Sequence, residues 1–418
     1  MTDRARRSAV AAAVADAHRR EWAFVLAATA RVAGSIDLAE ECVQDAYGAA
    51  LDAWLRDGLP RSPGAWLTTT ARRRALDVLR REQTLRRKLP LLVAPLGDEE
   101  AAVHPGDVIP DDRLRLVFTC CHPALAREAQ VALTLRLVCG LTIEEIANGF
   151  LVPQATMAAR VTRAKKKISA ARIPYRVPGP ADLPDRLDAV LTVVHLLFST
   201  GHTAPGGASL VRDDLVERAL DLGRMLALLM PDEPEVRGLL ALILLTDARR
   251  AARLDTEGSL VLLEDQDRAR WDPRAIDEGL LLVDGLGRGR PGRFALQAAI
   301  AAVHARAVSW QDTDWPLVLL LYDALLVVWP SPVVALNRVV AVLMVSGPAV
   351  ALAEVEALES DRWLAGYRYL AATKADLLRR LSRNGEAAAA YGEALALADN
   401  AAERAFLLGR ISEVGAGG

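Results

Sequence analysis

The chain has 418 residues, of which 52% are apolar and 25% charged, and its net charge is −2. This length and apolar content allow several domains with sizeable cores and exclude a disordered chain. Alanine, leucine, valine and arginine dominate the sequence. Because alanine, leucine and arginine have high helix propensity, we expect helices and not sheets.

The net charge hides two halves of opposite sign. Residues 1–176 contain 27 lysines and arginines against 20 acidic residues, a net of +7, and residues 177–418 contain 24 against 33, a net of −9. A cationic segment suits a polyanion such as nucleic acid, and an acidic one does not. The sequence therefore predicts two functions, one for each half.

Four cysteines occur, and none belongs to a CxxC pair. A disulfide framework is not expected, which fits a reducing cytoplasm. The run Cys120-Cys121-His122 raises a metal hypothesis, but adjacent cysteines chelate poorly and no second Cys/His pair follows at zinc-site spacing. We expect buried packing of these thiols, with no metal and no cofactor.

No segment of signal-peptide type opens the chain. The most hydrophobic run, 315–330, is 16 residues long and carries Asp323. It is too short to span a bilayer, and a charge near its centre is costly there. We therefore expect a cytoplasmic protein without membrane contact.

The first expected helical block covers residues 10–82. Its segment 37–54 is amphipathic, with Cys42, Val43, Ala46, Ala50, Ala53 and Trp54 predicted toward a core and Glu40, Glu41, Gln44, Asp45 and Asp52 predicted exposed. A loop with Gly58 and Pro60 follows. Pro63 then opens a second helix, because a proline in the first turn loses no hydrogen bond. That helix ends in a dense run of arginines.

A linker is predicted over 83–112, followed by a second helical block ending in a helix-turn-helix. Thr142 is the expected N-cap of its first helix, with Glu145 completing a capping box, and Pro153 breaks that helix after Phe150. The second helix is predicted to bury Met157, Val161, Ala164 and Ile168. Its other face is cationic, which is typical of a recognition helix in a DNA major groove, although a solvated basic face has the same pattern.

Prolines between Pro174 and Pro184 mark a second junction, and an all-helical region follows. Its clearest helix pair is 363–398, with a turn expected at Asn384-Gly385. The spacing of alanine, tyrosine and leucine after that turn is close to a tetratricopeptide signature. An earlier pair is expected over 315–358. Stacked helix pairs of this kind leave a surface that binds a peptide or protein.

Three segments together resemble a bacterial extracytoplasmic-function sigma factor. DLAEECVQDAYGAALDAW (37–54) is similar to the core-polymerase-binding helix of that family, PGAWLTTTARRRALDVLRR (63–81) to its −10 region and LTIEEIANGFLVPQATMAARVTRAKKKI (141–168) to its −35 helix-turn-helix. Segments 111–125, 229–254, 262–272 and 331–342 are similar to the subgroup with a long tetratricopeptide-like C-terminal extension. The resemblance spans nearly the whole chain.

The resemblance implies an all-α fold with region 2 over 1–82, a linker over 83–112, region 4 over 113–176 and a helical extension over 177–418. It implies three groups of site residues. The core polymerase would contact Glu41, Gln44, Asp45 and Tyr47. The −10 element would contact Arg72, Arg73, Arg74, Asp77, Arg80 and Arg81. The −35 element would contact Gln154, Thr156, Ala159, Arg160, Arg163, Lys165, Lys166 and Lys167.

These residue types suit promoter recognition. Arginine can bind guanine through two hydrogen bonds and glutamine can bind adenine, whereas lysines later in the recognition helix suit phosphates. Opening the −10 element requires capture of an unstacked base, for which the loop at 55–65 is placed. Trp66 is a candidate for the capturing residue, although a core position is the alternative. Many family members carry Asn where Arg73 stands, so the −10 sequence stays open.

No catalytic motif accompanies His195 and His202, which flank Ser199, and we do not expect an enzyme. The predicted function is binding of core RNA polymerase, double-stranded promoter DNA and the opened −10 strand. The extension would regulate activity, or contact a protein partner or the sigma domains themselves. Two alternatives stay open: a helix-turn-helix regulator with a sensory repeat domain that never acts as a sigma subunit, and a scaffold with vestigial DNA binding.

Overall fold

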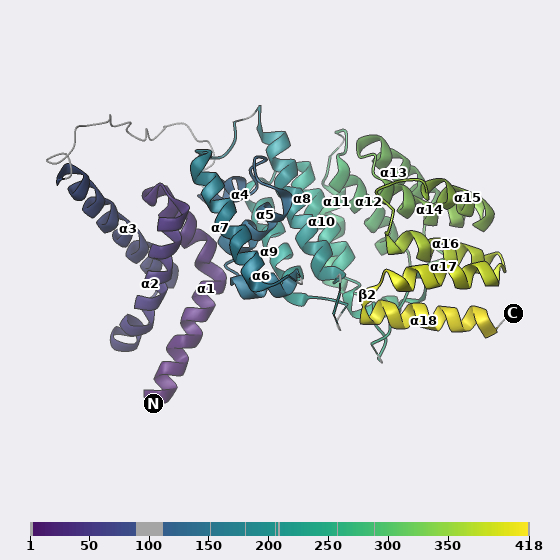
Figure 1. The fold of residues 1–418 in the computed structure, drawn as a ribbon, viewed down its shortest axis with the longest axis horizontal. Coiled ribbons are helices and arrows are strands. Elements are labelled where there is room, and N and C mark those ends of the chain that lie inside the picture. Colours follow the sequence, from purple (N-terminus) through teal and green to yellow (C-terminus); the bar gives the residue numbers. More distant parts are fainter. Residues whose placement is uncertain are drawn as a thin grey trace. The chain divides into compact units, whose positions relative to one another are not determined.

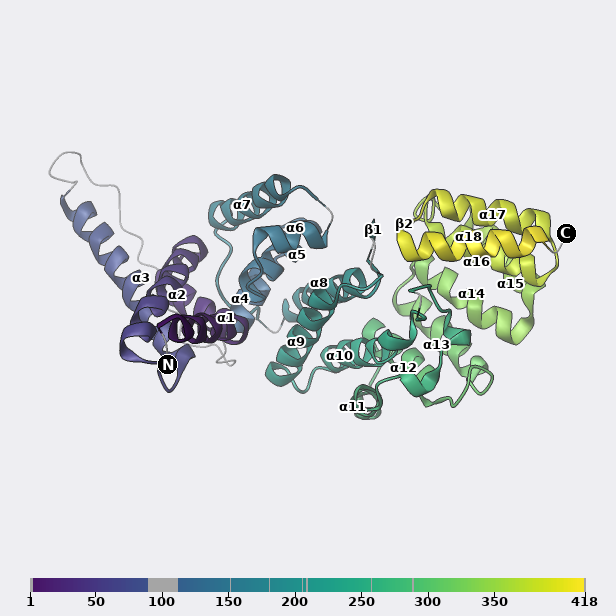
Figure 2. The ribbon, with the colours of Figure 1, turned by 90° about the horizontal axis from the view of Figure 1, so that it is seen from below.

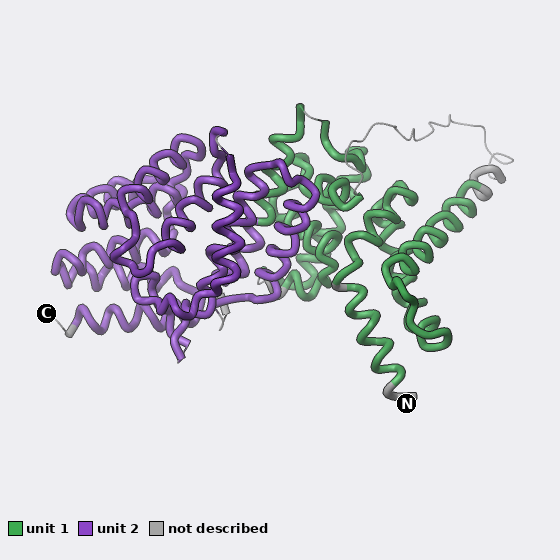
Figure 3. Tube along the Cα trace, turned by 180° about the vertical axis from the view of Figure 1, so that it is seen from behind, with its two compact units in different colours: residues 1–194 green, residues 195–418 purple. Residues whose placement is uncertain are grey.

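A computed structural model describes residues 3–88, 112–150, 152–179, 181–204, 206–207, 210–256, 258–287 and 289–416. Within these ranges almost all regular structure is helical, and the strands β1 (Gly206–Gly207) and β2 (Asp399–Asn400) are two residues each (Figure 1). The all-α prediction is confirmed. Two compact units divide the chain, residues 1–194 and residues 195–418 (Figure 3).

Three long helices open the first unit: α1 (Asp3–Ala33), α2 (Ile36–Asp57) and α3 (Pro63–Lys88). They pack against one another around fully buried Leu26, Val43 and Leu67. The stripe predicted on α2 is buried at all its positions except the half-buried Ala53. Helix α3 continues past residue 83, where the linker was expected to begin. The remainder of that predicted linker, 89–111, lies outside the described residues.

The second half of the first unit holds the helix-turn-helix. Its elements are α4 (Asp112–Cys120), α5 (Arg127–Leu133), the π-helix η2 (Thr134–Val138), α6 (Ile143–Gly149) and α7 (Gln154–Ala170). The capping box is confirmed, because the Glu145 amide donates to Thr142 Oγ1 at 3.1 Å and the Thr142 amide donates to Glu145 Oε2 at 2.7 Å. The four residues predicted to form the buried stripe of α7 are all buried.

Helix α8 (Leu183–His202) contributes its first residues to the first unit and its last to the second. The second unit continues with α9 (Asp213–Leu229), α10 (Pro234–Asp247), the short 3-10 helices η3 (Arg250–Ala252), η4 (Leu263–Asp265) and η5 (Arg268–Arg270), α11 (Pro273–Asp284), α12 (Arg293–Arg306), α13 (Trp315–Val328), α14 (Pro332–Ser346), α15 (Pro348–Leu358), α16 (Arg368–Arg380), α17 (Asn384–Ala396) and α18 (Ala401–Ala416).

Neighbouring helices of the second unit stack in chain order. From α12 to α18 each helix contacts the next, and α16, α17 and α18 lie side by side in Figure 2. Helices α9, α11 and α12 pack around α10. Its residues Leu239 through Leu245 are therefore all buried, and all of them are apolar. Each helix thus buries its apolar stripe against its neighbours in the sequence.

The turn between α16 and α17 occupies residues 381–383, directly before the predicted position. The Arg383 amide donates to the Leu378 carbonyl at 2.9 Å and the Ser382 amide to the Arg379 carbonyl at 2.9 Å. This is a Schellman motif with Ser382 at φ +59° in the position that usually holds glycine. The prediction at Asn384-Gly385 was wrong because the glycine lies in the first turn of α17 instead.

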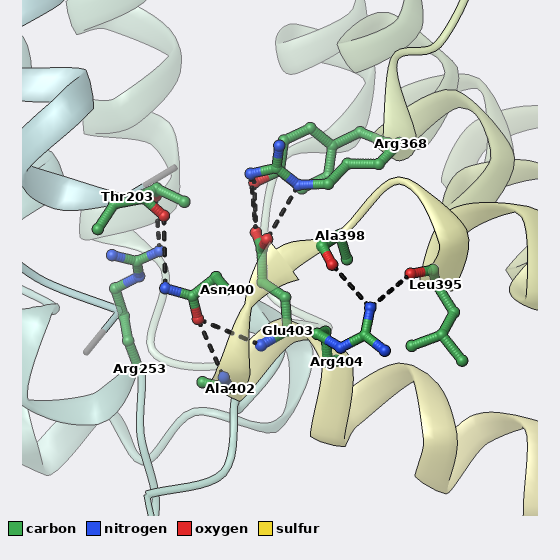
Figure 4. Close-up of polar contacts among 11 residues, drawn as sticks. Thr203, Arg253, Arg368, Leu395, Ala398, Asn400, Ala402, Glu403 and Arg404 are labelled. Carbon is green, nitrogen blue, oxygen red and sulfur yellow. Dashed lines mark hydrogen bonds and ion pairs between the residues drawn. The ribbon is translucent and has the colours of Figure 1, made fainter. Parts of the chain in front are cut away.

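Polar contacts join the first and last parts of the second unit (Figure 4). Strands β1 and β2 pair in parallel, and Asn400 Nδ2 donates to the Ala204 carbonyl at 3.4 Å. Asn400 Oδ1 also caps α18 by accepting from the Ala402 amide at 3.0 Å. The buried Glu403 accepts from the Tyr369 hydroxyl at 2.6 Å and pairs with Arg368 at 2.9 Å. Residues about two hundred positions apart are therefore held together by satisfied polar groups.

None of the helices in the described ranges is both long and apolar enough to cross a membrane.

Candidate polymerase and nucleic-acid interface

Helix α7 has a buried apolar stripe and a cationic exposed face. The predicted −35 residues on the exposed face are Gln154, Thr156, Ala159, Arg163, Lys166 and Lys167, with Arg160 half-buried beside them. The buried stripe fixes the rotation of the helix, so the cations point away from the core of the unit. The exposed face carries positive charge and hydrogen-bond donors over several turns.

Lys165 differs from the other cations of α7. Its Nζ lies 2.5 Å from Glu40 Oε2 and 3.0 Å from Asp37 Oδ1, and only 16% of its side chain is exposed. Burial lowers the pKa of Lys165, but the hydrogen bonds and charges of Glu40 and Asp37 outweigh it and raise that pKa overall. Lys165 therefore contacts helix α2 in this structure and not the solvent.

The prediction that Glu40 is exposed is wrong. Glu40 is 5% exposed, and its second oxygen lies 2.5 Å from Arg136 Nη2. It lies on the same buried stripe of α2 as Val43 and Tyr47. At Glu40 this stripe faces the helices of the second block, which supply Arg136 and Lys165. A buried carboxylate is tolerated only with paired charges, and Arg136 and Lys165 supply them. We call Glu40, Asp37, Arg136 and Lys165 the Glu40 cluster.

Further contacts surround the Glu40 cluster. Trp22 Nε1 donates to the Leu137 carbonyl at 3.0 Å, and the Tyr175 hydroxyl donates to the Ala27 carbonyl at 3.0 Å. Helix α1 also contacts α4 and η2 directly. The helices of the two sigma-like blocks thus share one interface inside the first unit, which the sequence analysis did not predict.

The four residues predicted to bind the polymerase core separate into two groups. Glu41, Gln44 and Asp45 are exposed on α2. Tyr47 is buried, its hydroxyl donates to the Ala17 carbonyl at 3.3 Å, and burial raises its pKa. The exposed acidic face is therefore available to a partner, whereas Tyr47 packs inside the unit.

The predicted −10 residues lie along α3. Arg73, Asp77, Arg80 and Arg81 are exposed, and Arg80 lies 3.7 Å from Asp77. Arg72 and Arg74 are half-buried. Arg72 donates from Nε to the Ala28 carbonyl at 3.2 Å, and Arg74 pairs with Asp45 at 2.6 Å.

Trp66, the candidate for base capture, is half-buried. Its ring packs edge-on against that of Trp54, with centroids 5.7 Å apart. A packed indole of this kind holds α3 against α2, which favours the core interpretation.

Two of the three candidate metal ligands are packed in the core, and His122 is half-buried. Cys120 and Cys121 are buried, and burial raises the pKa of Cys121 to about 11. His122 Nδ1 accepts a hydrogen bond from the Ala124 amide at 3.1 Å. In the part of the chain that the structure describes, no group of three or more His, Cys, Asp or Glu side chains could hold a metal ion.

The two histidines beside Ser199 pack on aromatic rings. His195 lies edge-on to Phe294 and His202 stacks on Phe198. Burial lowers the pKa of His195 to about 4 and that of His202 to about 2, so both are neutral at pH 7. Their environment is that of core residues.

Comparisons with known proteins place two families in the first unit and a third after it. Residues 18–84 match the model of sigma-70 region 2 and residues 115–168 match that of sigma-70 region 4. Residues 186–286 match a family of unknown function (DUF6596). The region 4 match contains α6 and most of α7, and the region 2 match contains α2 and most of α3.

The similar proteins agree with these matches. An uncharacterized protein of Rhizobium meliloti (strain 1021) is 45% identical over 379 residues, which cover 89% of each chain. The probable ECF RNA polymerase sigma factor SigI of Mycobacterium tuberculosis is 30% identical over 164 residues, 38% of this chain and 56% of that protein. No solved structure matches. The chain therefore carries regions 2 and 4 of a sigma-70 factor, which direct transcription initiation by binding core RNA polymerase and promoter DNA, and these regions are followed by a helical part that matches DUF6596.

Proposed function

We propose that α7 reads the −35 element, that α3 holds the opened −10 strand and that the exposed acids of α2 bind the polymerase core. The observation that supports this assignment most directly is the cationic exposed face of α7 opposite its buried stripe. Gln154, Thr156, Ala159, Arg160 and Arg163 lie in the first three turns of α7, the part of a recognition helix that reaches base edges. Lys166 and Lys167 follow and suit phosphates.

Helix α3 would contact the −10 element through its exposed cations Arg73, Arg80 and Arg81. Cation–phosphate contacts give affinity and position without reading sequence. The turn between α2 and α3, with Gly58 at φ +87°, is the proposed site of base capture. Arg72 and Arg74 would add phosphate contacts after giving up their present partners, the Ala28 carbonyl and Asp45.

Lys165 can contact phosphate only when the Glu40 cluster opens, because its ammonium group now faces two carboxylates of α2. The same opening would release the helix-turn-helix from α1 and α2. We therefore propose that the first unit is a closed form of the sigma domains, and that binding to polymerase and promoter separates them.

The proposed role of the acidic extension is to regulate the sigma domains or to contact a protein partner through tetratricopeptide-like helix pairs. Its net charge of −9 opposes the +7 of residues 1–176. The proposed location is the cytoplasm, where the polymerase acts. A truncation after Thr203 tests this role better than one after Pro178, because Arg186 of α8 donates to the Phe118 carbonyl at 2.6 Å and belongs to the first unit. Identical promoter binding by the truncated and full chains would contradict a regulatory role.

The test of core binding uses polymerase without DNA. We expect the full chain to form a one-to-one complex with core RNA polymerase, and Glu41→Lys to weaken that complex by about tenfold through charge reversal. Asp52→Lys is the matched control, because Asp52 is also exposed on α2 but lies nearer its end. No complex with core, while promoter DNA is still bound, would favour the alternative of a conventional helix-turn-helix regulator.

A further inference from the structure

The second unit contains a cavity of about 500 Å³. Helices α10, α12, α13, α14 and α16 contribute most of its wall, α17 adds Tyr391, and α18 adds Phe406 and Arg410, which pairs with Glu413 at 2.8 Å. Most of the lining is apolar or aromatic, and Trp310, Trp315 and Tyr322 lie along one part of it. Cavities of this size and lining are typical of small-molecule sites. Neither DNA nor polymerase binding accounts for this cavity.

Arg249 lines the cavity without a countercharge. Among the residues that the structure describes, no carboxylate pairs with its guanidinium group. The charged neighbours that act on it are the cations Arg253 and Arg268. Burial and these two cations lower the pKa of Arg249 to about 10 against the opposing effect of Tyr322, so the group is still charged at pH 7. A positive charge in an apolar cavity wall without a carboxylate partner is unfavourable, and an anion in the cavity would relieve it.

The acidic side chains of the cavity already have cationic partners. Asp376 accepts from Arg379 at 2.6 Å and from Arg380 at 2.7 Å. Arg380 also pairs with Glu264 at 2.9 Å. These carboxylates lie at the cavity wall together with Arg380, and their charge is balanced there. The positive charge of Arg249 is therefore not compensated by them.

Two further polar atoms of the cavity wall have no partner. Nδ1 of His304 and Nε1 of Trp315 are buried without a hydrogen-bond partner. Burial, Arg249 and Arg268 lower the pKa of His304 to about 4, so its imidazole is neutral at pH 7. Unsatisfied buried polar groups are rare in folded proteins, and a ligand is one way of satisfying them. Arg249, His304 and Trp315 together form a polar set within an aromatic wall.

We propose that this cavity binds a small organic anion with an apolar, ring-containing body and one carboxylate or phosphate group. The anionic group pairs with Arg249, because a guanidinium group binds such oxygens through two parallel hydrogen bonds. The body packs against Trp310, Trp315 and Tyr322. The neutral His304 is available for one further hydrogen bond. This inference goes beyond promoter recognition and does not depend on it.

Calorimetric titration of the full chain, without DNA or polymerase, tests the proposal. The probes are 2-naphthoate and its uncharged amide, 2-naphthamide, which share one aromatic body. We expect saturable binding of 2-naphthoate at one site, and we expect Arg249→Gln to weaken it by about tenfold or more while changing amide binding little. Arg224→Gln is the matched control, because Arg224 is exposed on α9 and pairs with Glu278 at 3.0 Å outside the cavity.

Three results would overturn the proposal. One is equal affinity of wild-type and Arg249→Gln proteins for 2-naphthoate. Another is the absence of saturable binding of 2-naphthoate up to millimolar concentration. The third result needs only the wild-type chain, so it still tests the proposal if circular dichroism shows that Arg249→Gln is not folded. There, amide binding as tight as carboxylate binding would show that the cavity does not select for negative charge.

Discussion

The Glu40 cluster and the Arg249 cavity both bury cations, and they differ in what faces the charge. In the Glu40 cluster, Arg136 and Lys165 each lie 2.5 Å from a carboxylate oxygen of Glu40. In the cavity, Arg249 has no carboxylate partner among the described residues, and Arg253 and Arg268 add positive charge. In the Glu40 cluster the chain supplies the countercharge itself, whereas in the cavity the countercharge would have to come from a bound anion.

This difference separates a structural contact from a binding site. A buried charge with a partner holds two elements together, and removing that partner costs several kcal/mol. A charge that faces a cavity and has no partner lowers the stability of the folded protein until a ligand pairs with it. The first arrangement supports the proposed closed form of the sigma domains, and the second supports the proposed anion site of the extension.

The largest expected effect is that of Glu40→Gln. The amide leaves Arg136 without a carboxylate and Lys165 with Asp37 alone, which we expect to destabilise the contact between the sigma domains by about 3 kcal/mol. Hydrogen exchange of the amides in η2 and α7 should then accelerate by about two orders of magnitude. Glu41→Gln is the control, because Glu41 is exposed on the same helix. Equal exchange in both variants would show that the Glu40 cluster does not hold the domains together.

Replacement of Arg163 by alanine tests an exposed cation of α7 against the buried Lys165. If Arg163 reads a base, the loss should be about 2 kcal/mol on the preferred promoter and much smaller on other sequences. Lys167→Ala should weaken binding similarly on all sequences and reduce its salt dependence. Binding measured on a promoter and on a scrambled duplex at two salt concentrations distinguishes these roles. A uniform loss for Arg163→Ala would make it a phosphate contact.

The cavity predicts an acid sensitivity of the second unit through His304. The pKa of His304 is about 4 in the folded protein and about 6.5 when unfolded, so the unfolded chain binds more protons between these values. The free energy of unfolding therefore falls as the pH drops from 6.5 toward 4, by about 1–2 kcal/mol from this residue at pH 5. Thermal denaturation at pH 7 and pH 5 should show a smaller decrease for His304→Gln than for the wild type. An unchanged decrease would contradict the low pKa of this histidine.

Thr142→Ala gives the smallest effect, on a local contact that involves neither region. Loss of the N-cap hydroxyl leaves the Glu145 amide of α6 without its acceptor, which costs about 1 kcal/mol. Denaturation by urea would measure the loss, and DNA affinity should fall only slightly. A loss of DNA binding above tenfold would show that the capping box does more than begin α6.

The elements predicted well are those whose signals are local. The stripe of α7, the capping box at Thr142 and the burial of Trp54 follow from spacing along one helix. Glu40 was predicted incorrectly because its partner Lys165 lies 125 residues away, and a charged residue beside an apolar stripe looks exposed until that partner is known. One signal was available, since Glu40 precedes Val43 and Tyr47 on the same stripe.

The cavity could not be predicted for the same reason. Its wall joins residues between Leu242 and Arg410 that meet only after the helices stack. Arg249 lies in the segment 229–254, but nothing in that segment indicates a missing countercharge, which is a property of the packed unit. The turn before α17 was misplaced because Ser382, and not a glycine, adopts the left-handed conformation.

Transcription in vitro tests the central claim most directly. Purified core RNA polymerase would be mixed with a pool of genomic promoter fragments, with and without the full chain. We predict promoter-specific transcripts only in the presence of the chain, and their loss when Glu41→Lys and Arg163→Ala are combined. Absence of transcripts with the wild-type chain, while it still binds the same DNA, would contradict its action as a sigma subunit.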